Sequence, residues 1–263
     1  MRDPALHQAI LTGGGVGALA RKIGISQPSL SNWNRVPAER VLQVEGSTGI
    51  DRAVLRPDLY PATDAPKRAV DAVDEIDAAR AQEYALLSAL LARAPSAEML
   101  ARLAKLRGDP SPLGVVHAAL AEAASAADPE RVEREFFELF IGIGRGELVP
   151  YGSYYQTGFL HERPLARLRD DLARLGVERV EGQAEPEDQA AMLCEIMAGL
   201  AGGRFQTSAG ADQELFEKHL APWIGRFFTD LEHAKAADFY SRVGMVGRVF
   251  MQIEGEAFAL PCW

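Results

Sequence analysis

The sequence predicts an all-α protein, on three observations. Apolar residues recur at intervals of three and four along most of the 263-residue chain, which is the period of an amphipathic helix. No stretch shows the alternation of apolar and polar residues that is typical of successive strands, so parallel-sheet and hydrolase scaffolds are excluded. Hydrophobic residues make up 48% of the chain, enough to bury a sizeable core or two. We therefore expect one or two helical domains.

Charge and proline content divide the chain into two parts. Residues 1–60 contain seven Arg or Lys and five Asp or Glu, a balance of +2, whereas the whole chain carries -9, which leaves -11 for the remainder. Such different charges favour different partners. Three prolines fall between Pro57 and Pro66, before a long helix-forming run, so the boundary is placed near residue 66. The prediction is a small domain over 1–61, a linker over 62–73 and a larger helical domain over 74–263.

Apolar spacing in the small domain predicts helices at about 4–11, 15–22, 26–33 and 37–47. Gly24 lies between the second and third, where a tight turn needs a residue that tolerates positive φ. Ser26 is expected to cap the third helix, and Pro28 is tolerated in its first turn because that amide has no intrahelical partner. This pattern is typical of a helix-turn-helix.

The third helix has one apolar face and one polar face. Leu30 and Trp33 are expected to face inward with Leu19 and Ile23. Amide and hydroxyl side chains on the outer face suit hydrogen bonds to base edges, and basic side chains nearby suit phosphates. The candidate DNA-binding residues are Gln27, Ser29, Ser31, Asn32, Arg35, Arg21 and Lys22.

The stretch GALARKIGISQPSLSNW, followed by VPAERVLQVEGSTGIDRAVLRPDLYP, resembles the YdaS/Cro-type helix-turn-helix family over residues 5–61. The resemblance implies a small DNA-binding module whose third helix enters the major groove, with promoter DNA as a partner. There is no Arg or Lys between Gln27 and Asn34, so one copy would neutralise few phosphates and dimerisation is expected to be required. The alternative is a helical protein-interaction module that does not bind DNA.

The larger domain shows helical stripes throughout. Pro222 is expected to kink the helix that contains it. The expected core-facing residues are Ile76, Leu86, Leu87, Leu90 and Leu91; Phe136, Phe137, Leu139 and Phe140; Leu193, Ile196, Met197 and Leu200; Phe216, Leu220, Trp223 and Phe227; and Phe239, Val243, Val246 and Phe250.

No motif in the sequence predicts catalysis, a cofactor or a metal. The glycine-rich stretches TGGGVG at 12–17 and IGIGRG at 141–146 follow no strand and lack the GK[ST] of a phosphate-binding loop. The five histidines have no HExxH spacing and the two cysteines no CxxC spacing. His219 is therefore read as a packed or half-exposed side chain. No apolar run approaches the roughly 20 residues of a membrane span, and the N-terminus lacks the apolar core of a secretory signal. A cytoplasmic protein that is not an enzyme is expected.

Two segments of the larger domain carry a second resemblance. VPYGSYYQTGFLHERPLARLRDDLARLGV places Tyr151, Tyr154, Tyr155 and Phe159 in an expected loop, and EPEDQAAMLCEIMAGL begins an expected helix with Pro186 and two acids. Together with KHLAPWIGRFF and DFYSRVGMVGRVFMQIEGEAF, these segments resemble the TorD/DmsD family of redox-enzyme maturation chaperones over about 80–258. The expected fold is therefore a TorD-like all-helical domain behind a helix-turn-helix.

That resemblance implies a chaperone that binds the twin-arginine signal peptide of an exported molybdenum oxidoreductase, of the formate dehydrogenase or dimethyl-sulfoxide-reductase type, until its cofactor is inserted. Such a peptide has two arginines followed by an apolar stretch, so its receptor needs carboxylates beside an apolar, aromatic groove. Family members exchange helices between subunits, which leaves a homodimer open. Whether the molybdenum cofactor touches this chain is also open.

The implied signal-peptide residues lie in the family's two motifs. Tyr151, Gly152, Ser153 and Tyr154 match its Y-x-S-Y loop, and Pro186 and Asp188 match its P-x-D. Asp188, with Glu187, is expected to meet the arginines, and Tyr151, Tyr154 and Leu193 to line the groove. Gln189 replaces the family's usual histidine, so this position cannot titrate. The alternative is that Pro186, Glu187 and Asp188 only start a helix, where acids complement the helix dipole, and that the tyrosines plug a loop onto the core.

Three functions remain open at this point. In the first, the chaperone reports signal-peptide supply to a promoter through its helix-turn-helix. In the second, the chaperone carries a helix-turn-helix domain that has no regulatory function. In the third, the chain is a transcriptional regulator whose helical body is a repurposed sensor or interaction domain.

Overall fold

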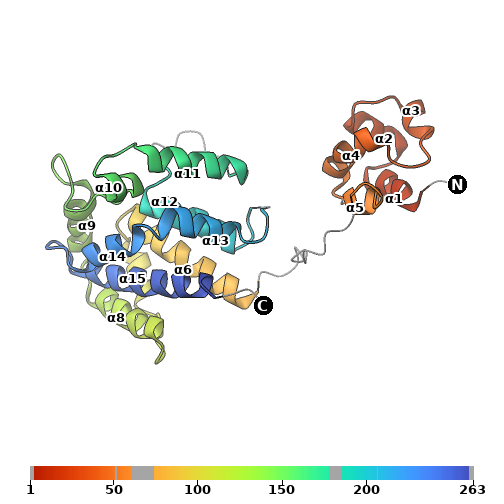
Figure 1. Ribbon diagram of the computed structural model, residues 1–263. Coiled ribbons are helices and arrows are strands. Elements are labelled where there is room, and N and C mark those ends of the chain that lie inside the picture. The colour runs from red at the N-terminus through yellow and green to blue at the C-terminus, as the bar shows by residue number, and fades with distance from the viewer. Residues whose placement is uncertain (1–2, 51, 61–73, 178–184, 206, 261–263) are drawn as a thin grey trace. The chain divides into compact units, whose positions relative to one another are not determined.

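The computed structural model describes residues 3–50, 52–60, 74–177, 185–205 and 207–260. The chain forms two compact units, Met1–Lys67 and Arg68–Trp263 (Figure 1). The expected linker, 62–73, lies outside the described residues. Helices provide the regular structure in both units, and the described residues hold no strand beyond one isolated bridge between Tyr151 and Gln189. The predicted all-α class is confirmed.

The first unit is built from short helices around one small core. Its elements are α1 (Pro4–Thr12), α2 (Val16–Lys22), α3 (Gln27–Ser31), the 3-10 turn η1 (Ala38–Arg40), α4 (Val41–Thr48) and α5 (Arg52–Leu55). Its buried core consists of Leu6, Ala9, Ile10, Leu19, Ala20, Ile23, Leu30, Val36, Val41, Val44 and Leu55. Trp33 is half-buried against this core. The inward positions predicted from the helical period are therefore confirmed.

The α2–α3 turn has the predicted local chemistry. Gly24 has φ of +70°, a conformation that costs glycine little. The Ser26 hydroxyl accepts a hydrogen bond from the Ser29 amide at 3.3 Å, and Pro28 occupies the first turn of α3. The helix is shorter than the predicted 26–33, because Asn32 already forms its C-cap.

The second unit is a larger helical assembly. Its elements are α6 (Glu75–Ala92), α7 (Ala97–Leu103), α8 (Pro112–Ala126), α9 (Pro129–Phe136), the π-helical segment η2 (Phe137–Ile141), α10 (Gly152–Thr157), α11 (Arg163–Arg174), α12 (Ala190–Ala201), α13 (Ala211–Leu215), the π-helical segment η3 (Phe216–Leu220), α14 (Ile224–Glu232) and α15 (Phe239–Phe258). Helix α12 packs along α6, and α15 packs against both α14 and α8 (Figure 1). Helix α12 is apolar on almost every side, which places it in the centre of the core.

Two glycines allow α14 and α15 to approach closely. A Cβ at Gly247 would lie 2.2 Å from the Phe228 ring, and one at Gly244 would lie 2.5 Å from the amide nitrogen of Glu232. Both distances are far below van der Waals contact, so the interface requires residues without a side chain.

Three expectations about helix faces need correction. Ile76 is 72% exposed, because the buried apolar part of α6 begins only at Tyr84. Phe137 is 42% exposed, because it opens a π-helical segment whose wider turn breaks the 3.6-residue spacing. Pro222 does more than kink a helix, since it lies in the turn that separates η3 from α14.

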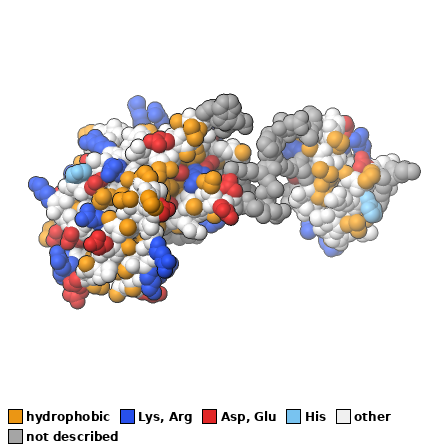
Figure 2. Space-filling model, turned by 90° about the horizontal axis from the view of Figure 1, so that it is seen from below, with side chains coloured by type: hydrophobic (Ala, Val, Ile, Leu, Met, Phe, Trp, Pro, Cys, Tyr) orange, Lys and Arg blue, Asp and Glu red, His pale blue; other side chains and the backbone are white. Residues whose placement is uncertain are grey.

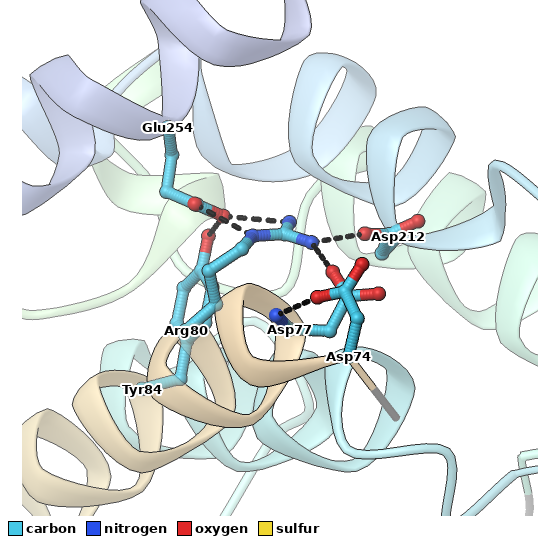
Figure 3. Close-up of polar contacts among 6 residues, drawn as sticks. All are labelled: Asp74, Asp77, Arg80, Tyr84, Asp212 and Glu254. Atoms are coloured by element: carbon cyan, nitrogen blue, oxygen red, sulfur yellow. Dashed lines mark hydrogen bonds and ion pairs between the residues drawn. The ribbon is translucent and has the colours of Figure 1, made fainter. Parts of the chain in front are cut away.

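A buried polar network joins α6, α13 and α15 around one guanidinium (Figure 3). Arg80 donates to both carboxylate oxygens of Glu254 at 2.8 Å, and its Nη1 lies 2.8 Å from Asp77 and 2.9 Å from Asp212. The Tyr84 hydroxyl donates to Glu254 at 2.9 Å. Burial alone would lower the pKa of Arg80, but the hydrogen bonds and charges of Glu254 and Asp212 raise it above its usual value. The network fixes the first turns of α6 against the rest of the unit.

Among the described helices, none combines the length and apolarity that a membrane crossing needs.

Candidate functional site

The two motifs singled out in the larger domain lie side by side. The Gly152 amide donates to the Asp188 carbonyl at 2.9 Å, and the Ala190 amide donates to the Pro150 carbonyl at 2.8 Å. These bonds surround the antiparallel bridge between Tyr151 and Gln189. Two short segments more than 30 residues apart are thereby joined by their backbones, and α10 and α12 both begin at the junction.

Asp188 is the buried polar centre of this junction. Its side chain is 3% exposed, and its Oδ2 accepts a hydrogen bond from the Ser153 amide at 2.7 Å. Among the described residues, Asp188 Oδ1 and the buried Ser153 hydroxyl oxygen have no hydrogen-bond partner. A carboxylate bonded to a backbone amide is a strong interaction, so Asp188 positions the start of α10. An arginine can reach it only if the preceding turn moves.

Helix α12 begins later than predicted. Pro186, Glu187 and Asp188 were expected in its first turn, but the first helical residue is Ala190. Gln189 is the N-cap, and its side-chain oxygen accepts a hydrogen bond from the Met192 amide at 3.2 Å. The two acids therefore lie in the turn before the helix rather than in its first turn.

Tyr154 and Tyr155 lie in the short helix α10, whose N-cap is Tyr151, rather than in the expected loop. The Tyr151 hydroxyl donates to Glu185 at 2.6 Å, and burial together with this carboxylate raises the tyrosine pKa. The Tyr154 ring is half-buried, with the guanidinium of Arg145 5.4 Å from its centroid. Tyr155 packs against Trp223 with ring centroids 5.5 Å apart. Phe159 follows the helix and is exposed.

The remaining candidates differ in accessibility. Glu187 accepts a hydrogen bond from Arg169 of α11 at 2.8 Å, and Glu185 is exposed. Pro186 is half-buried. Leu193 is fully buried in the core, so the expectation that it lines a surface groove is corrected: it supports the junction from inside.

Sequence reasoning missed three residues that complete the junction. Glu185 precedes the P-x-D motif, Arg169 lies on α11, and Trp223 packs its indole against Gly152, where a Cβ would lie 3.0 Å from Nε1. The sequence shows Glu185 as an acid beside the P-x-D motif, but it does not show that Glu185 pairs with the Tyr151 hydroxyl. No local pattern indicates which distant arginine or tryptophan meets the motif.

The other polar sites of the second unit provide fewer candidate binding groups. Within the described ranges, no group of three or more His, Cys, Asp or Glu side chains is arranged to hold a metal ion. His219 is buried, with Nε2 2.7 Å from Asp171, which confirms it as a packed side chain. A cavity of about 390 Å³ lies between the end of α8, α9 and residues 236–239, and none of its lining residues belongs to the two motifs.

The candidate DNA-binding residues of the first unit are accessible to solvent. All seven side chains predicted to contact DNA are exposed, while Leu30 on the same short helix is completely buried. The Ser26 and Ser29 hydroxyl oxygens lie 2.7 Å apart. Arg35 pairs with Asp58, an acid that follows α5, and no sequence pattern predicts this contact. The helix-turn-helix thus presents a polar face.

Comparison with known families supports both resemblances. Residues 107–229 match the family model described as nitrate reductase delta subunit, and residues 6–63 match the one described as bacterial toxin YdaS. The two matched segments overlap the two stretches in which the sequence shows a family resemblance.

Curated relatives carry the name chaperone protein TorD. The protein from Vibrio cholerae serotype O1 (strain ATCC 39315 / El Tor Inaba N16961) is 26% identical over 127 residues, which cover 45% of this chain and 58% of that protein. The protein from Vibrio atlanticus (strain LGP32) is 22% identical over 135 residues, covering 48% and 63%. The chain spans about three fifths of the length of these relatives.

A solved structure, of a protein from Archaeoglobus fulgidus assigned to redox enzyme maturation, aligns with a TM-score of 0.48 and 18% identity. The alignment covers 66% of this chain and 93% of that protein.

Proposed function

We propose that the second unit is a cytoplasmic chaperone that binds the twin-arginine signal peptide of a molybdenum oxidoreductase before export, and that the first unit binds promoter DNA. The observation that carries the chaperone proposal is the junction itself. Its backbone bonds bring the Y-x-S-Y and P-x-D motifs together, with the aromatic ring of Tyr151 and the carboxylates of Glu185 and Glu187 at one place. These are the groups that a peptide with arginines and an apolar stretch requires.

The carboxylates have different roles in this proposal. Glu185 and Glu187 lie before α12 and already receive donors, from Tyr151 and Arg169 respectively. An incoming guanidinium replaces these donors, since Arg binds carboxylates through a planar pair of N–H groups. Asp188 keeps one acceptor oxygen without a donor among the described residues, so a peptide that displaces the 185–187 turn has a further oxygen to bind.

The test is calorimetric titration with a twin-arginine signal peptide from a neighbouring molybdoenzyme, beside a peptide with both arginines replaced by alanine. We expect micromolar affinity, about -8 kcal/mol, for the first peptide only. Glu185→Gln and Glu187→Gln each weaken binding about tenfold, the loss of one charge-assisted pair. Glu195→Gln, which removes an exposed acid of α12 itself, is the matched control and leaves affinity unchanged. Equal binding of both peptides would contradict the proposal.

A transcriptional role is the second candidate, favoured by the exposed polar face of α3. If the first unit reads DNA, a promoter fragment shifts in a sequence-specific manner, and the shift weakens as salt rises. The double variant Gln27→Ala, Asn32→Ala abolishes sequence preference while leaving the salt dependence, because these side chains face bases rather than phosphates. Unchanged promoter preference in that variant would reject α3 as the recognition helix.

Coupling between the units is tested by measuring DNA affinity with and without the signal peptide. If peptide binding and DNA binding are linked, each ligand changes the affinity of the other by the same factor. Identical DNA affinity in both conditions would separate the two activities and favour a chaperone whose head has no regulatory function.

A further inference from the structure

The candidate DNA-binding residues of the first unit lie in a stretch of sequence without carboxylates. From residue 4 to residue 38 the sequence contains no Asp or Glu, and this stretch spans α1, α2 and α3. Its basic side chains Arg21, Lys22 and Arg35 are exposed. A phosphate backbone that approaches this stretch therefore meets no acid belonging to it. An acid brought there from elsewhere in the fold has a large effect on the local charge.

Asp58 is such an acid. It follows α5, and its Oδ1 accepts a hydrogen bond from Nη2 of Arg35 at 2.5 Å. Arg56 binds the same carboxylate with two donors, Nε to Oδ1 and Nη2 to Oδ2, each at 2.9 Å. A third donor of Arg56, Nη1, reaches the Val36 carbonyl at 2.7 Å. Two guanidinium groups thus converge on one carboxylate beside the chain that leaves α3.

The charge state of this cluster is settled by its partners. Hydrogen bonding from Arg56 lowers the pKa of Asp58 to about 2, so the carboxylate is ionised at neutral pH. The side chain of Arg35 is 46% exposed and that of Arg56 is 11% exposed. Arg35 is therefore able to turn toward a ligand in solvent. Arg56 is held in place by its hydrogen bonds to Asp58 and to the Val36 carbonyl.

We propose that Asp58 takes the position of a DNA backbone phosphate on Arg35 in the free protein, and so lowers the affinity of the first unit for double-stranded DNA. Carboxylate and phosphate are alternative acceptors for the same guanidinium fork. The Nη2 group of Arg35 must leave Asp58 before it can bind a phosphate, and the carboxylate repels the DNA backbone. This inference rests on the proposed DNA binding of the first unit and adds to it a residue that limits affinity.

The first unit supplies a matched control. Arg52 and Glu45 form a second Arg–carboxylate pair, with Nη2 2.9 Å from Oε2, outside the acid-free stretch. The variants Asp58→Asn and Glu45→Gln each remove one negative charge. Asp58→Asn weakens the pairs with Arg35 and Arg56, and Glu45→Gln weakens the pair with Arg52. A general effect of net charge is equal in both variants, so a larger effect of Asp58→Asn comes from the arginines that Asp58 binds.

The experiment measures binding of a labelled random-sequence duplex of about 30 base pairs to the full chain by fluorescence anisotropy, at salt concentrations from about 50 to 200 mM, because phosphate contacts are independent of sequence. For Asp58→Asn we expect about tenfold tighter binding and a plot of log K against log salt that is steeper by about 0.9, the value of one added phosphate contact. Glu45→Gln changes affinity less than about twofold, with an unchanged slope. Arg35→Ala weakens binding, and adding Asp58→Asn to it gives a smaller gain than Asp58→Asn gives in the natural chain.

The other outcomes would overturn the role of Asp58, the DNA binding of the first unit, or both. If Asp58→Asn and Glu45→Gln bind alike, the role of Asp58 is wrong while DNA binding stands. If neither the natural chain nor Asp58→Asn binds the duplex at the lowest salt, both the DNA-binding proposal and this inference are wrong. If Asp58→Asn does not fold, as judged by circular dichroism, Arg35→Ala decides the question: unchanged affinity and slope in that variant would overturn the inference.

Discussion

The Ser153 amide donates to the carboxylate of Asp188 at 2.7 Å, and this one bond ties the first turn of α10 to the turn that precedes α12. Both residues are almost completely buried, although each belongs to a motif that the sequence marks as a binding segment. The bond explains how a short polar motif acts structurally: it fixes the position of its neighbours, Tyr151 and Glu185, which carry the accessible groups.

Asp188→Asn is expected to destabilise the second unit by about 1.5 to 3 kcal/mol, the range for hydrogen bonds to charged groups. The amide side chain keeps the size but loses the charge that the Ser153 amide binds. Asp238→Asn, which weakens an exposed pairing with Arg131, is expected to cost less than about 1 kcal/mol. Urea denaturation of both variants measures the difference. Equal stability of the two would show that the buried bond contributes no more than the surface pair.

Gly247→Ala is expected to destabilise the α14–α15 interface by about 1 to 3 kcal/mol, the usual cost of overpacking. The added methyl group would lie 2.2 Å from the ring of Phe228, which is itself completely buried and has no room to withdraw.

Gly255→Ala is the matched control on the same helix. A Cβ there meets Phe216 at 3.9 Å, an ordinary contact, so the higher helix propensity of alanine is expected to stabilise the protein by about 0.5 to 1 kcal/mol. Thermal unfolding of the two variants should therefore shift in opposite directions. A destabilised Gly255→Ala would mean that the close approach extends further along α15 than the structure shows.

The pair of His117 on α8 and Glu83 on α6 predicts a pH dependence of stability. Nε2 of His117 lies 3.0 Å from Glu83, and this hydrogen bond raises the histidine pKa against the opposing effect of burial, with a smaller contribution from Asp109. Because the folded pKa is above the unfolded value of about 6.5, the stabilisation is complete below that pH and is lost as the pH rises through the folded pKa.

Urea denaturation at about pH 6 and about pH 8.5 tests this sign. The natural chain should lose more stability over that interval than His117→Gln, which keeps a donor for Glu83 but does not titrate. An identical pH response in the two proteins would show that the pair does not carry the dependence.

The sequence predicted the features of the fold that depend on residues close together in the chain. Gly24, Ser26 and Leu30 were placed correctly because turn, cap and apolar period depend on residues close in the chain. The prediction for Phe137 was wrong because a π-helical segment changes the spacing of residues along the helix face, and no residue nearby in the sequence predicts such a segment. The segment 151–159, predicted as a loop, is a helix over most of its length. Its Gly152 packs on Trp223, which lies in a distant part of the chain, so no local pattern predicts this contact.

The candidate site shows the same limit. The sequence identified both motifs of the junction, and the structure joins them. It did not predict that Asp188 is buried and bonded to the Ser153 amide, because this partner lies 35 residues away. The pairing of Arg35 with Asp58 was hidden for the same reason, since the two are 23 residues apart. Long-range partners decide which of the charged residues in a motif are available to a ligand.

Arg80 provides the strongest test of the packing between α6, α13 and α15. Arg80→Ala leaves the carboxylates of Asp77, Asp212 and Glu254 without their common cation, so we expect a loss of about 3 to 5 kcal/mol, as for breaking a buried ion pair. Arg131→Ala, which removes an exposed pairing with Asp238, is expected to cost about 0 to 1 kcal/mol. Urea denaturation followed by circular dichroism compares the two. If both variants lost the same small amount, the carboxylates of the network would have to be solvated in the folded protein, and the burial of Glu254 at 1% exposure would not describe the molecule in solution.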